Sequence, residues 1–245
     1  MLDFFNLPIG VIDSGIGGLS VLNKLVNSFP SESFLYYGDN DNSPYGNKPL
    51  SFIKERVAVI INSLYKREIK GLVIACNTVS TNFYSEIKND YPFFIIPTIP
   101  PIIKGEGVYL MCTSNTAKSD FVKENYKNNV IAFPSLAKTI EKNVFNLNSF
   151  KVYPYFQNLK KDVKTLVLGC THYSFIDKNL SSQLGVKTVD GYDTIVKDLK
   201  TELEFSNLYN VNPQTITFLG EQNLFNKMVY ERVFGGVSGR ESKKN

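Results

Sequence analysis

One pattern occurs twice in this sequence, as Leu72-Val73-Ile74-Ala75-Cys76-Asn77-Thr78 and as Leu166-Val167-Leu168-Gly169-Cys170-Thr171-His172. Each copy has four apolar or small residues, then a cysteine, then two polar residues. The apolar run is typical of a strand that is buried on both faces, as in a parallel sheet. Ligands bind beyond the carboxyl ends of such strands. The two copies therefore predict one cleft with Cys76 and Cys170 on opposite sides.

Short apolar runs alternate with helical patterns along the rest of the chain, which predicts an α/β fold with mainly parallel sheets flanked by helices. Beside the two repeated strands, we expect strands over residues 9–12, 34–38, 93–96, 108–112, 130–133, 187–190 and 216–219. One helix is expected to begin at a capping Ser51, and another to run from Ser80 to Asn89. Thr113–Ser119 is expected to be a hydroxyl-rich loop.

Three prolines, at positions 97, 100 and 101, favour a linker, so we expect a domain boundary near residue 96. The last strand and helix are expected to return to the first domain. The predicted first domain is therefore residues 1–95 plus 207–245, and the second is residues 96–206. The residues from 235 onward are expected to form a frayed tail.

The composition is ordinary for a soluble globular protein, with 43% hydrophobic and 20% charged residues in a chain of 245. The net charge of +4 is small and its basic residues are scattered, which argues against a nucleic-acid partner. No apolar run approaches the roughly 18 residues of a membrane span, and the first residues do not resemble a secretory signal. Three cysteines, far apart, argue against a disulfide framework. We therefore expect a cytoplasmic protein with free thiols and no membrane partner.

The turn Asp13-Ser14-Gly15-Ile16-Gly17-Gly18 follows the first expected strand and precedes a helix. It is not a nucleotide-binding turn, because Ser20 stands at the third glycine of the dinucleotide motif and no Gly-Lys-Ser/Thr follows. The carboxylate of Asp13 suits a ligand ammonium group or a general base, while the glycines let backbone amides approach the ligand. The alternative is a tight turn in which Asp13 and Ser14 only cap the helix.

The segment Asp39–Gly46 has the acid spacing of a calcium loop, but Pro44 replaces the required glycine and Leu50 the bidentate glutamate. We interpret it as a turn-rich loop that displays Tyr45 and backbone amides. No other metal site is expected, because the sequence has no Cys-x-x-Cys and a single histidine.

The cysteines and the histidine are the reactive residues. Cys76 precedes a helix, whose dipole and free amides would lower the thiol pKa below its usual value of about 8.5. His172 lies two residues after Cys170 and is a candidate to act on it. Cys170 and His172 alone would suit a cysteine hydrolase, but that interpretation leaves Cys76 unexplained. Cys112, outside the repeat, is expected to be a buried packing thiol.

Two facing thiols suit a reaction with proton transfer on both faces of one carbon. One thiolate removes a proton, and the other thiol returns a proton from the opposite side, which inverts the centre. The carbanion needs fixed donors, and Asn77, Thr78, Thr171 and nearby amides are available. No lysine lies in a motif for a pyridoxal Schiff base, so the thiols are expected to act without a cofactor.

Four motifs occur in order over nearly the whole chain: Asp13-Ser14-Gly-x-Gly-Gly, Pro44-Tyr45-Gly46, Ala75-Cys76-Asn77-Thr78 and Gly169-Cys170-Thr171-His172-Tyr173. Together they are highly specific, and the chain resembles the glutamate racemases of the bacterial cell-wall pathway. The resemblance implies two pseudo-symmetric α/β domains with the active site between them, and a cofactor-independent two-base mechanism. It also implies interconversion of L- and D-glutamate for peptidoglycan synthesis, and a homodimer.

The resemblance further implies residue roles. Cys76 would act on the D-enantiomer and Cys170 on the L-enantiomer, with Asp13, Glu141 and His172 as supporting acid and base groups. The implied substrate-binding residues are Asp13, Ser14, Tyr45, Gly46, Asn77, Thr78, Thr116, Thr171 and His172. The chain departs from the family in the loop Asp39–Ser43, which lacks a basic residue common there, and at Ser174, where a proline is common.

Other functions stay open on the sequence alone. One is a related cofactor-independent isomerase, such as an aspartate racemase or a one-thiol decarboxylase. Another is a catalytically silent amino-acid-binding protein on the same fold, because a fold does not determine function. Exchange of the α-proton of glutamate would separate the enzyme from the silent binder.

Overall fold

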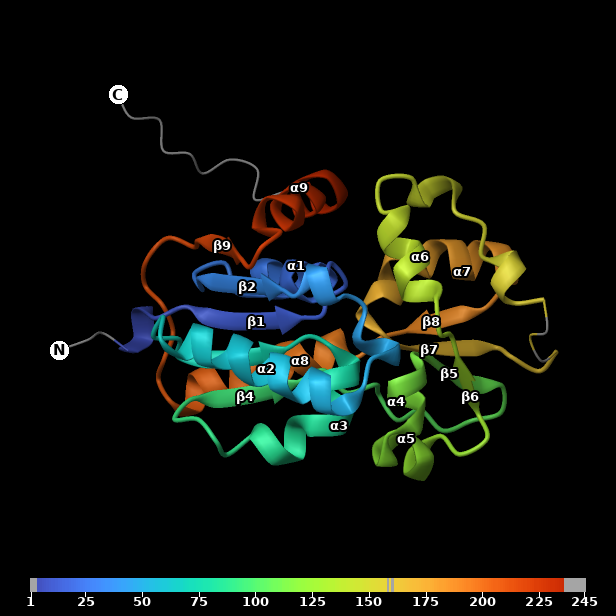
Figure 1. The fold of residues 1–245 in the computed structure, drawn as a ribbon, viewed down its shortest axis with the longest axis horizontal. Helices are drawn as coiled ribbons and strands as arrows, with labels where there is room; N and C mark the ends of the chain where they lie inside the picture. The colour runs from blue at the N-terminus through green and yellow to red at the C-terminus, as the bar shows by residue number, and fades with distance from the viewer. Residues whose placement is uncertain (1–3, 158, 160, 236–245) are drawn as a thin grey trace.

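The computed structural model describes residues 4–157, 159 and 161–235, and most of the expected C-terminal tail lies outside them. These residues form two parallel sheets with helices packed around each, arranged as two lobes (Figure 1). The predicted α/β fold with parallel sheets is therefore confirmed. No helix among the described residues is long and apolar enough to cross a membrane.

The first sheet has five strands. In spatial order they are β4 (Phe94–Pro97), β3 (Gly71–Ile74), β1 (Ile9–Asp13), β2 (Phe34–Gly38) and β9 (Ile216–Leu219). The central strands β1 and β3 are buried at every position, as their uninterrupted apolar sequences predict. Strand β9 comes from the end of the chain and pairs in parallel with β2.

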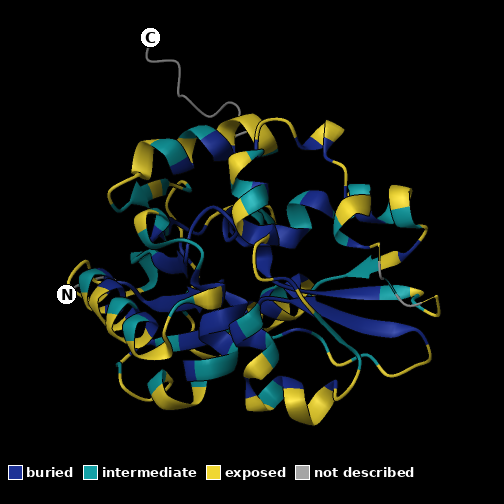
Figure 2. Cartoon of the chain, turned by 45° about the vertical axis from the view of Figure 1, so that its right-hand side comes forward, coloured by how far each residue is buried: buried dark blue, intermediate teal, exposed yellow. Residues whose placement is uncertain are grey.

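The second sheet has four strands. In spatial order they are β6 (Val130–Ala132), β5 (Val108–Cys112), β7 (Thr165–Gly169) and β8 (Lys187–Val189). The pairings β3 with β1 and β7 with β5 give the two repeated strands equivalent central places in their sheets. Figure 2 shows the buried residues concentrated on the strands and the exposed ones on the outer faces of the helices.

The helices lie between the strands in the chain. They are α1 (Leu19–Ser28), α2 (Leu50–Tyr65), α3 (Asn77–Ile87), α4 (Ser114–Lys118), α5 (Asp120–Asn125), α6 (Leu136–Lys142), α7 (Asp177–Leu184), α8 (Tyr192–Phe205) and α9 (Asn223–Phe234). Short 3-10 helices η1 (Phe4–Asn6), η2 (Asn40–Asn42), η3 (Tyr45–Asn47), η4 (Leu147–Ser149), η5 (Tyr153–Tyr155) and η6 (Thr171–Ile176) complete the described secondary structure.

Three local expectations were wrong. Pro49 is the N-cap of α2, so Ser51 lies inside that helix. Helix α3 begins at Asn77 rather than at Ser80. The segment expected to be a hydroxyl-rich loop contains α4, because the side chain of Thr113 accepts a hydrogen bond from the amide of Thr116 and caps a helix there.

The strand pairing and the helix packing indicate where the chain divides into its two lobes. Strand β4 pairs with β3 as far as Pro97, so a boundary near residue 96 falls within a strand. Helix α8 packs on α1 and β4, which are both elements of the first lobe. We therefore propose that the first lobe consists of residues 4–97 and 192–235, and that the second lobe is inserted between them.

Candidate active site

The two repeated strands end at the junction of the two lobes. Strand β3 leads into Cys76, the N-cap of α3, and β7 leads into Cys170, which precedes η6. At this junction α1 contacts η6, η3 contacts α4, and α3 contacts α4. The two cysteines lie near enough that a negative charge on Cys170 raises the pKa of Cys76. The carboxyl ends of both central strands therefore serve one site.

Cys76 lies in apolar surroundings, with 5% of its surface exposed. Burial raises the pKa of the Cys76 thiol well above its ordinary value, and the charge of Asp13 adds to this effect. The amides of Thr78 and Val79, at the start of α3, oppose the shift. The expected net lowering of the pKa was wrong, because desolvation outweighs the helix N-terminus. Cys76 is therefore a neutral thiol in this site.

Cys170 lies beside a pair of charged groups. Nδ1 of His172 is 3.7 Å from Sγ of Cys170, and Nε2 of His172 is 2.7 Å from Oε1 of Glu141. Burial opposes a charged imidazole, but hydrogen bonds with Cys170 and Glu141 outweigh it and raise the pKa of His172 well above its ordinary value. An imidazolium therefore lies between the thiol and the carboxylate.

Glu141 reaches this pair from α6, with 19% of its side chain exposed. Burial alone would raise the pKa of Glu141. Hydrogen bonds from His172, from the hydroxyl of Ser43 and from the amide of Ile16 outweigh burial and lower the pKa of Glu141. The carboxylate is consequently ionised and can hold the imidazolium in place.

Asp13, at the end of β1, joins the two lobes. Its Oδ2 accepts a hydrogen bond from the hydroxyl of Thr171 at 3.1 Å, and its Oδ1 accepts one from the amide of Gly15 at 2.9 Å. Burial raises the pKa of Asp13. The charge of His172 and both hydrogen bonds oppose this shift but do not cancel it, so the pKa lies above its ordinary value. Asp13 does not cap α1, whose N-cap is Gly18, but its bond from the amide of Gly15 does hold the tight turn.

The loop with the Pro-Tyr-Gly motif is held by a network of its own. The hydroxyl of Tyr45 donates to Oδ2 of Asp39 at 2.5 Å. Arg56, on α2, donates to both oxygens of the same carboxylate, at 2.7 and 3.1 Å. Burial raises the pKa of Asp39, but the hydrogen bonds from Arg56 and Tyr45 outweigh it and lower that pKa. The phenol of Tyr45 is thus engaged within the protein, and the backbone amides remain the groups that the loop can offer.

A cluster of hydroxyl groups lies where α3 meets α4. Oγ1 of Thr78 is 3.0 Å from Oγ1 of Thr113 and 3.2 Å from Oγ1 of Thr116. The neighbouring Asn77 donates its amide hydrogen to the carbonyl of Thr98 at 2.9 Å. These hydroxyls come from both lobes and can reorient to donate to an anion.

The predicted site residues thus lie at one junction, and nearly all of them are buried. The buried ones are Asp13, Ser14, Tyr45, Gly46, Cys76, Asn77, Thr78, Thr116, Cys170, Thr171 and His172. Sequence reasoning missed Ser43, Arg56 and Thr113. Two of these adjoin recognised motifs, since Ser43 precedes the Pro-Tyr-Gly motif and Thr113 begins the hydroxyl-rich segment. Arg56 lies within α2, outside every recognised motif, and no sequence signal marks it.

The structure describes no group of three or more histidine, cysteine or acidic side chains that could hold a metal ion. All three cysteines are free and buried. Burial raises the pKa of the Cys112 thiol to about 12, with a smaller contribution from Cys170. Its position in an apolar cluster with Leu110 and Val167 agrees with the expected packing role.

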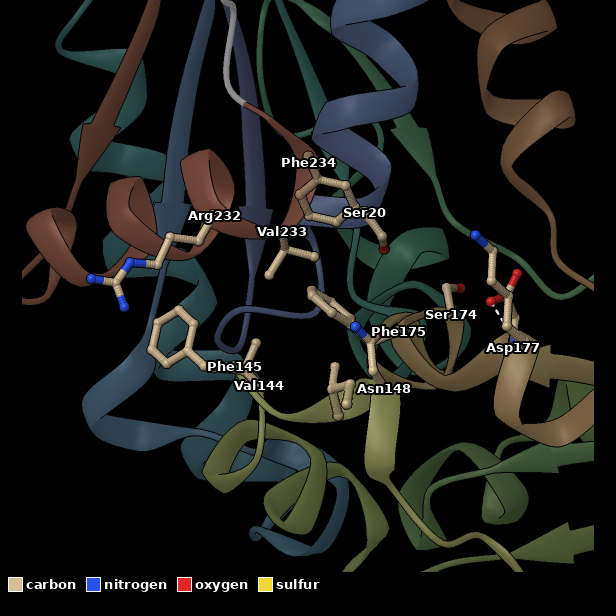
Figure 3. A pocket seen from close by; sticks show the side chains of 12 residues that line it. Ser20, Val144, Phe145, Asn148, Ser174, Phe175, Asp177, Arg232, Val233 and Phe234 are labelled. Atoms are coloured by element: carbon tan, nitrogen blue, oxygen red, sulfur yellow. Dashed lines mark hydrogen bonds between the residues drawn. The ribbon is translucent and has the colours of Figure 1, made fainter. Parts of the chain in front are cut away.

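A cavity of about 440 Å³ lies beside the site and is lined by α1, α9, η6 and the segment after α6 (Figure 3). Ser20 and Ser174 line it where it approaches the site, and Phe145, Phe175 and Phe234 line its apolar part. The hydroxyl of Tyr192 lies 2.7 Å from Oγ of Ser20 and 2.8 Å from Oγ of Ser174. Neither Cys76 nor Cys170 lines this cavity, so it is separate from the reactive groups.

The chain is similar in sequence and in fold to known proteins. No protein-family model matches the chain. The glutamate racemase of Clostridium acetobutylicum is 33% identical to it over 229 residues, covering 85% of this chain and 89% of that protein. A glutamate racemase from Thermus thermophilus, solved with β-chloro-D-alanine, has a TM-score of 0.79 at 29% identity, covering 94% of this chain and 93% of that one. The Francisella tularensis enzyme, solved with D-glutamate, has a TM-score of 0.73 at 26% identity, with 94% of both chains covered.

Proposed function

The chain belongs to the glutamate racemase family, and from this we propose that it interconverts L- and D-glutamate through proton transfers by Cys76 and Cys170, without a cofactor. The observation that carries the proposal is the pair of free thiols at the ends of the two repeated strands, at one junction between the lobes. Acid and base on opposite faces of one carbon are what inversion requires.

The two thiols differ in a way that suits their opposite roles. An imidazolium next to Cys170 stabilises negative charge on that sulfur, so Cys170 can remove the α-proton of L-glutamate. The C–H bond breaks, its electron pair stays on the α-carbon, and the proton goes to sulfur. Cys76, a neutral thiol, then donates its proton to the other face and becomes the thiolate. The reverse sequence converts D-glutamate.

We assign binding of the substrate to polar groups of both lobes. The hydroxyls of Thr78 and Thr116 and the loop amides at Tyr45 and Gly46 are donors for the carboxylates of glutamate. The hydroxyl of Thr171, which donates to Asp13 in this structure, joins them by turning toward the substrate. The carboxylate of Asp13 suits the α-ammonium group. Ser14, Asn77 and His172 complete the proposed contacts. Fixed donors around the carboxylate next to the carbanion would stabilise its developing charge.

We also propose that the enzyme supplies D-glutamate for peptidoglycan, in the cytoplasm and as a homodimer. The free thiols support a reducing compartment. Light scattering coupled to gel filtration tests the homodimer, since a monomeric mass would contradict it.

Circular dichroism of the protein mixed with L-glutamate, D-glutamate or L-aspartate, with no cofactor added, tests the reaction and its substrate together. Loss of optical activity with both glutamates and not with aspartate is the expected result. A loss with aspartate alone would point to an aspartate racemase. Constant signals with all three would leave an amino-acid binder, which ligand titration would identify.

A further inference from the structure

The carboxylate of Glu141 is held by a residue of the other lobe. Oγ of Ser43 donates a hydrogen bond to Oε1 of Glu141 at 2.6 Å. The same Oε1 lies 2.7 Å from Nε2 of His172. One oxygen therefore accepts two hydrogen bonds, one from each lobe. The amide of Ile16 also donates to this carboxylate. Because the terminal torsion of a glutamate is broad, each further donor narrows the orientation of the carboxylate.

Ser43 is itself fixed by the loop that carries it. Its amide donates to the carbonyl of Asn40 at 3.1 Å. On either side of it, Asn42 and Tyr45 both donate to Asp39, which Arg56 also holds. Ser43 consequently presents its hydroxyl from a rigid loop.

The hydrogen bond lies directly against the backbone at Gly15. A methyl group at Gly15 would overlap both Oε1 of Glu141 and Oγ of Ser43. The glycine of the first motif therefore makes room for this hydrogen bond. Since the donor belongs to the first lobe and the acceptor to the second, the bond exists only when the two lobes are docked.

We propose that Ser43 is a positioning residue: it orients the carboxylate of Glu141, which in turn holds His172 against Cys170. The inference rests on the proposed racemase activity and assigns one more residue to it. Three other ionisable groups interact electrostatically with Glu141. They are His172 on η6, Asp13 on β1 and Tyr36 on β2. Ser43 is an uncharged donor among them, so its removal changes orientation without changing the charge of the site.

Kinetics of Ser43→Ala test the proposal. Loss of a hydrogen bond to a charged group should lower kcat by about tenfold in both directions, with a smaller change in KM, because Ser43 itself contacts no substrate in the proposed site. Ser43→Thr keeps a hydroxyl and should restore most of the rate. Ser33→Ala is the matched control, because Ser33 is a buried serine that bonds to Thr215 at the opposite end of β2; its kcat should match that of the wild type.

A double-mutant cycle separates this role from a purely structural one. If Ser43 acts through Glu141, then Ser43→Ala should change kcat by less than about twofold when Glu141→Gln is already present. An equal loss in both backgrounds would overturn the proposal.

The single histidine gives a second measurement that needs no substrate. Nitrogen-15 NMR of histidine-labelled protein reports on the ring of His172 alone. Protonation of Glu141 at acid pH should perturb that ring, and loss of the Ser43 hydrogen bond should move this transition to higher pH. An unshifted transition in Ser43→Ala would refute the role of Ser43. A wild type that does not racemise glutamate would instead refute the proposed function, and the NMR result would still decide on Ser43.

Discussion

The two reactive thiols of this protein share a sequence pattern but not an electrostatic environment. Cys76 faces the negative charge of Asp13, and burial raises the pKa of its thiol. Cys170 faces the imidazolium of His172, which Glu141 holds. The repeat therefore supplies symmetry of position. The difference between acid and base comes from its last residue, which is Thr78 in one copy and His172 in the other, and from Asp13 and Glu141 outside it.

Substitution of either thiol should abolish racemisation. Cys76→Ser and Cys170→Ser each replace a proton carrier by a hydroxyl of much higher pKa, and we expect losses of at least about a hundredfold. Cys112→Ala is the control, since Cys112 packs in an apolar cluster and should be dispensable for turnover. Polarimetry with both enantiomers gives the rates. Near-normal turnover of either serine variant would contradict the two-base mechanism.

Asp13 offers a test of its own. Asp13→Asn keeps the shape of the side chain and removes the charge that faces Cys76 and Thr171. We expect turnover to slow at least tenfold, which corresponds to about 1.4 kcal/mol in the barrier. An unchanged kcat in the same assay would show that the carboxylate only supports the turn.

Much of the fold and of the site could be predicted because the repeated strands are buried on both faces, which leaves uninterrupted apolar runs. The residues after those runs lie at the site because parallel strands end at one edge. The prediction failed where the outcome depends on surroundings. The pKa of Cys76 depends on desolvation, which a sequence does not show. Ser43 gains its partner only through the docking of two lobes.

Helix positions illustrate the same limit. Thr113 begins a helix because its side chain can cap the amide of Thr116, which makes a helix of a segment expected to be a loop. Helix α8 follows the second sheet in the chain but packs on α1 and β4 of the first. The packing partner of α8 is set by tertiary contacts, which local sequence does not show.

A buried ion pair ties several elements together far from the site. Nζ of Lys70 lies 2.6 Å from Oε2 of Glu32, with both side chains almost fully buried. The same ammonium donates to the carbonyls of Phe5 in η1 and Leu208 after α8. Lys70 therefore holds two segments in place. One is η1, and the other is the segment after α8 that leads back to the first sheet.

Lys70→Met should therefore destabilise the protein strongly. Removing one partner leaves the carboxylate of Glu32 buried without its cation, and such changes cost about 3–5 kcal/mol. Urea unfolding measures the loss. Lys54→Met is the matched control, because the Lys54–Glu86 pair is exposed and solvent-screened pairs contribute little to stability. Equal effects of the two variants would contradict the importance of burial.

The docking of the two lobes depends on close approach at Gly17. A methyl group there would overlap Oγ1 of Thr171 and the ring of His172. Gly17→Ala should therefore push η6 away from α1 and lower kcat by about a hundredfold, as displacements near 1 Å do. Polarimetry measures the rate, and a normal kcat would refute the close contact.

Protonation of His172 also affects the stability of the whole molecule. Because folding raises the pKa of His172 above its ordinary value of 6.5, its contribution to stability is complete below pH 6.5 and is lost as the pH rises through the folded value. The free energy of unfolding should accordingly fall on the alkaline side. Urea titrations of the wild type and His172→Gln at several pH values test this, and a fall of equal size in both would assign the effect to other groups.

The position of β9 has a consequence for how the protein is made. The second sheet uses one continuous segment of chain, whereas β9 joins β2 across a long separation; the bond from Thr215 to Ser33 spans 182 residues. During synthesis the second lobe can complete its sheet while the first still lacks its last strand. Until the ribosome delivers β9, one edge of β2 remains unpaired, and unpaired strand edges invite association with other chains. The nascent protein is therefore most vulnerable to aggregation late in translation, at an edge that the mature molecule covers.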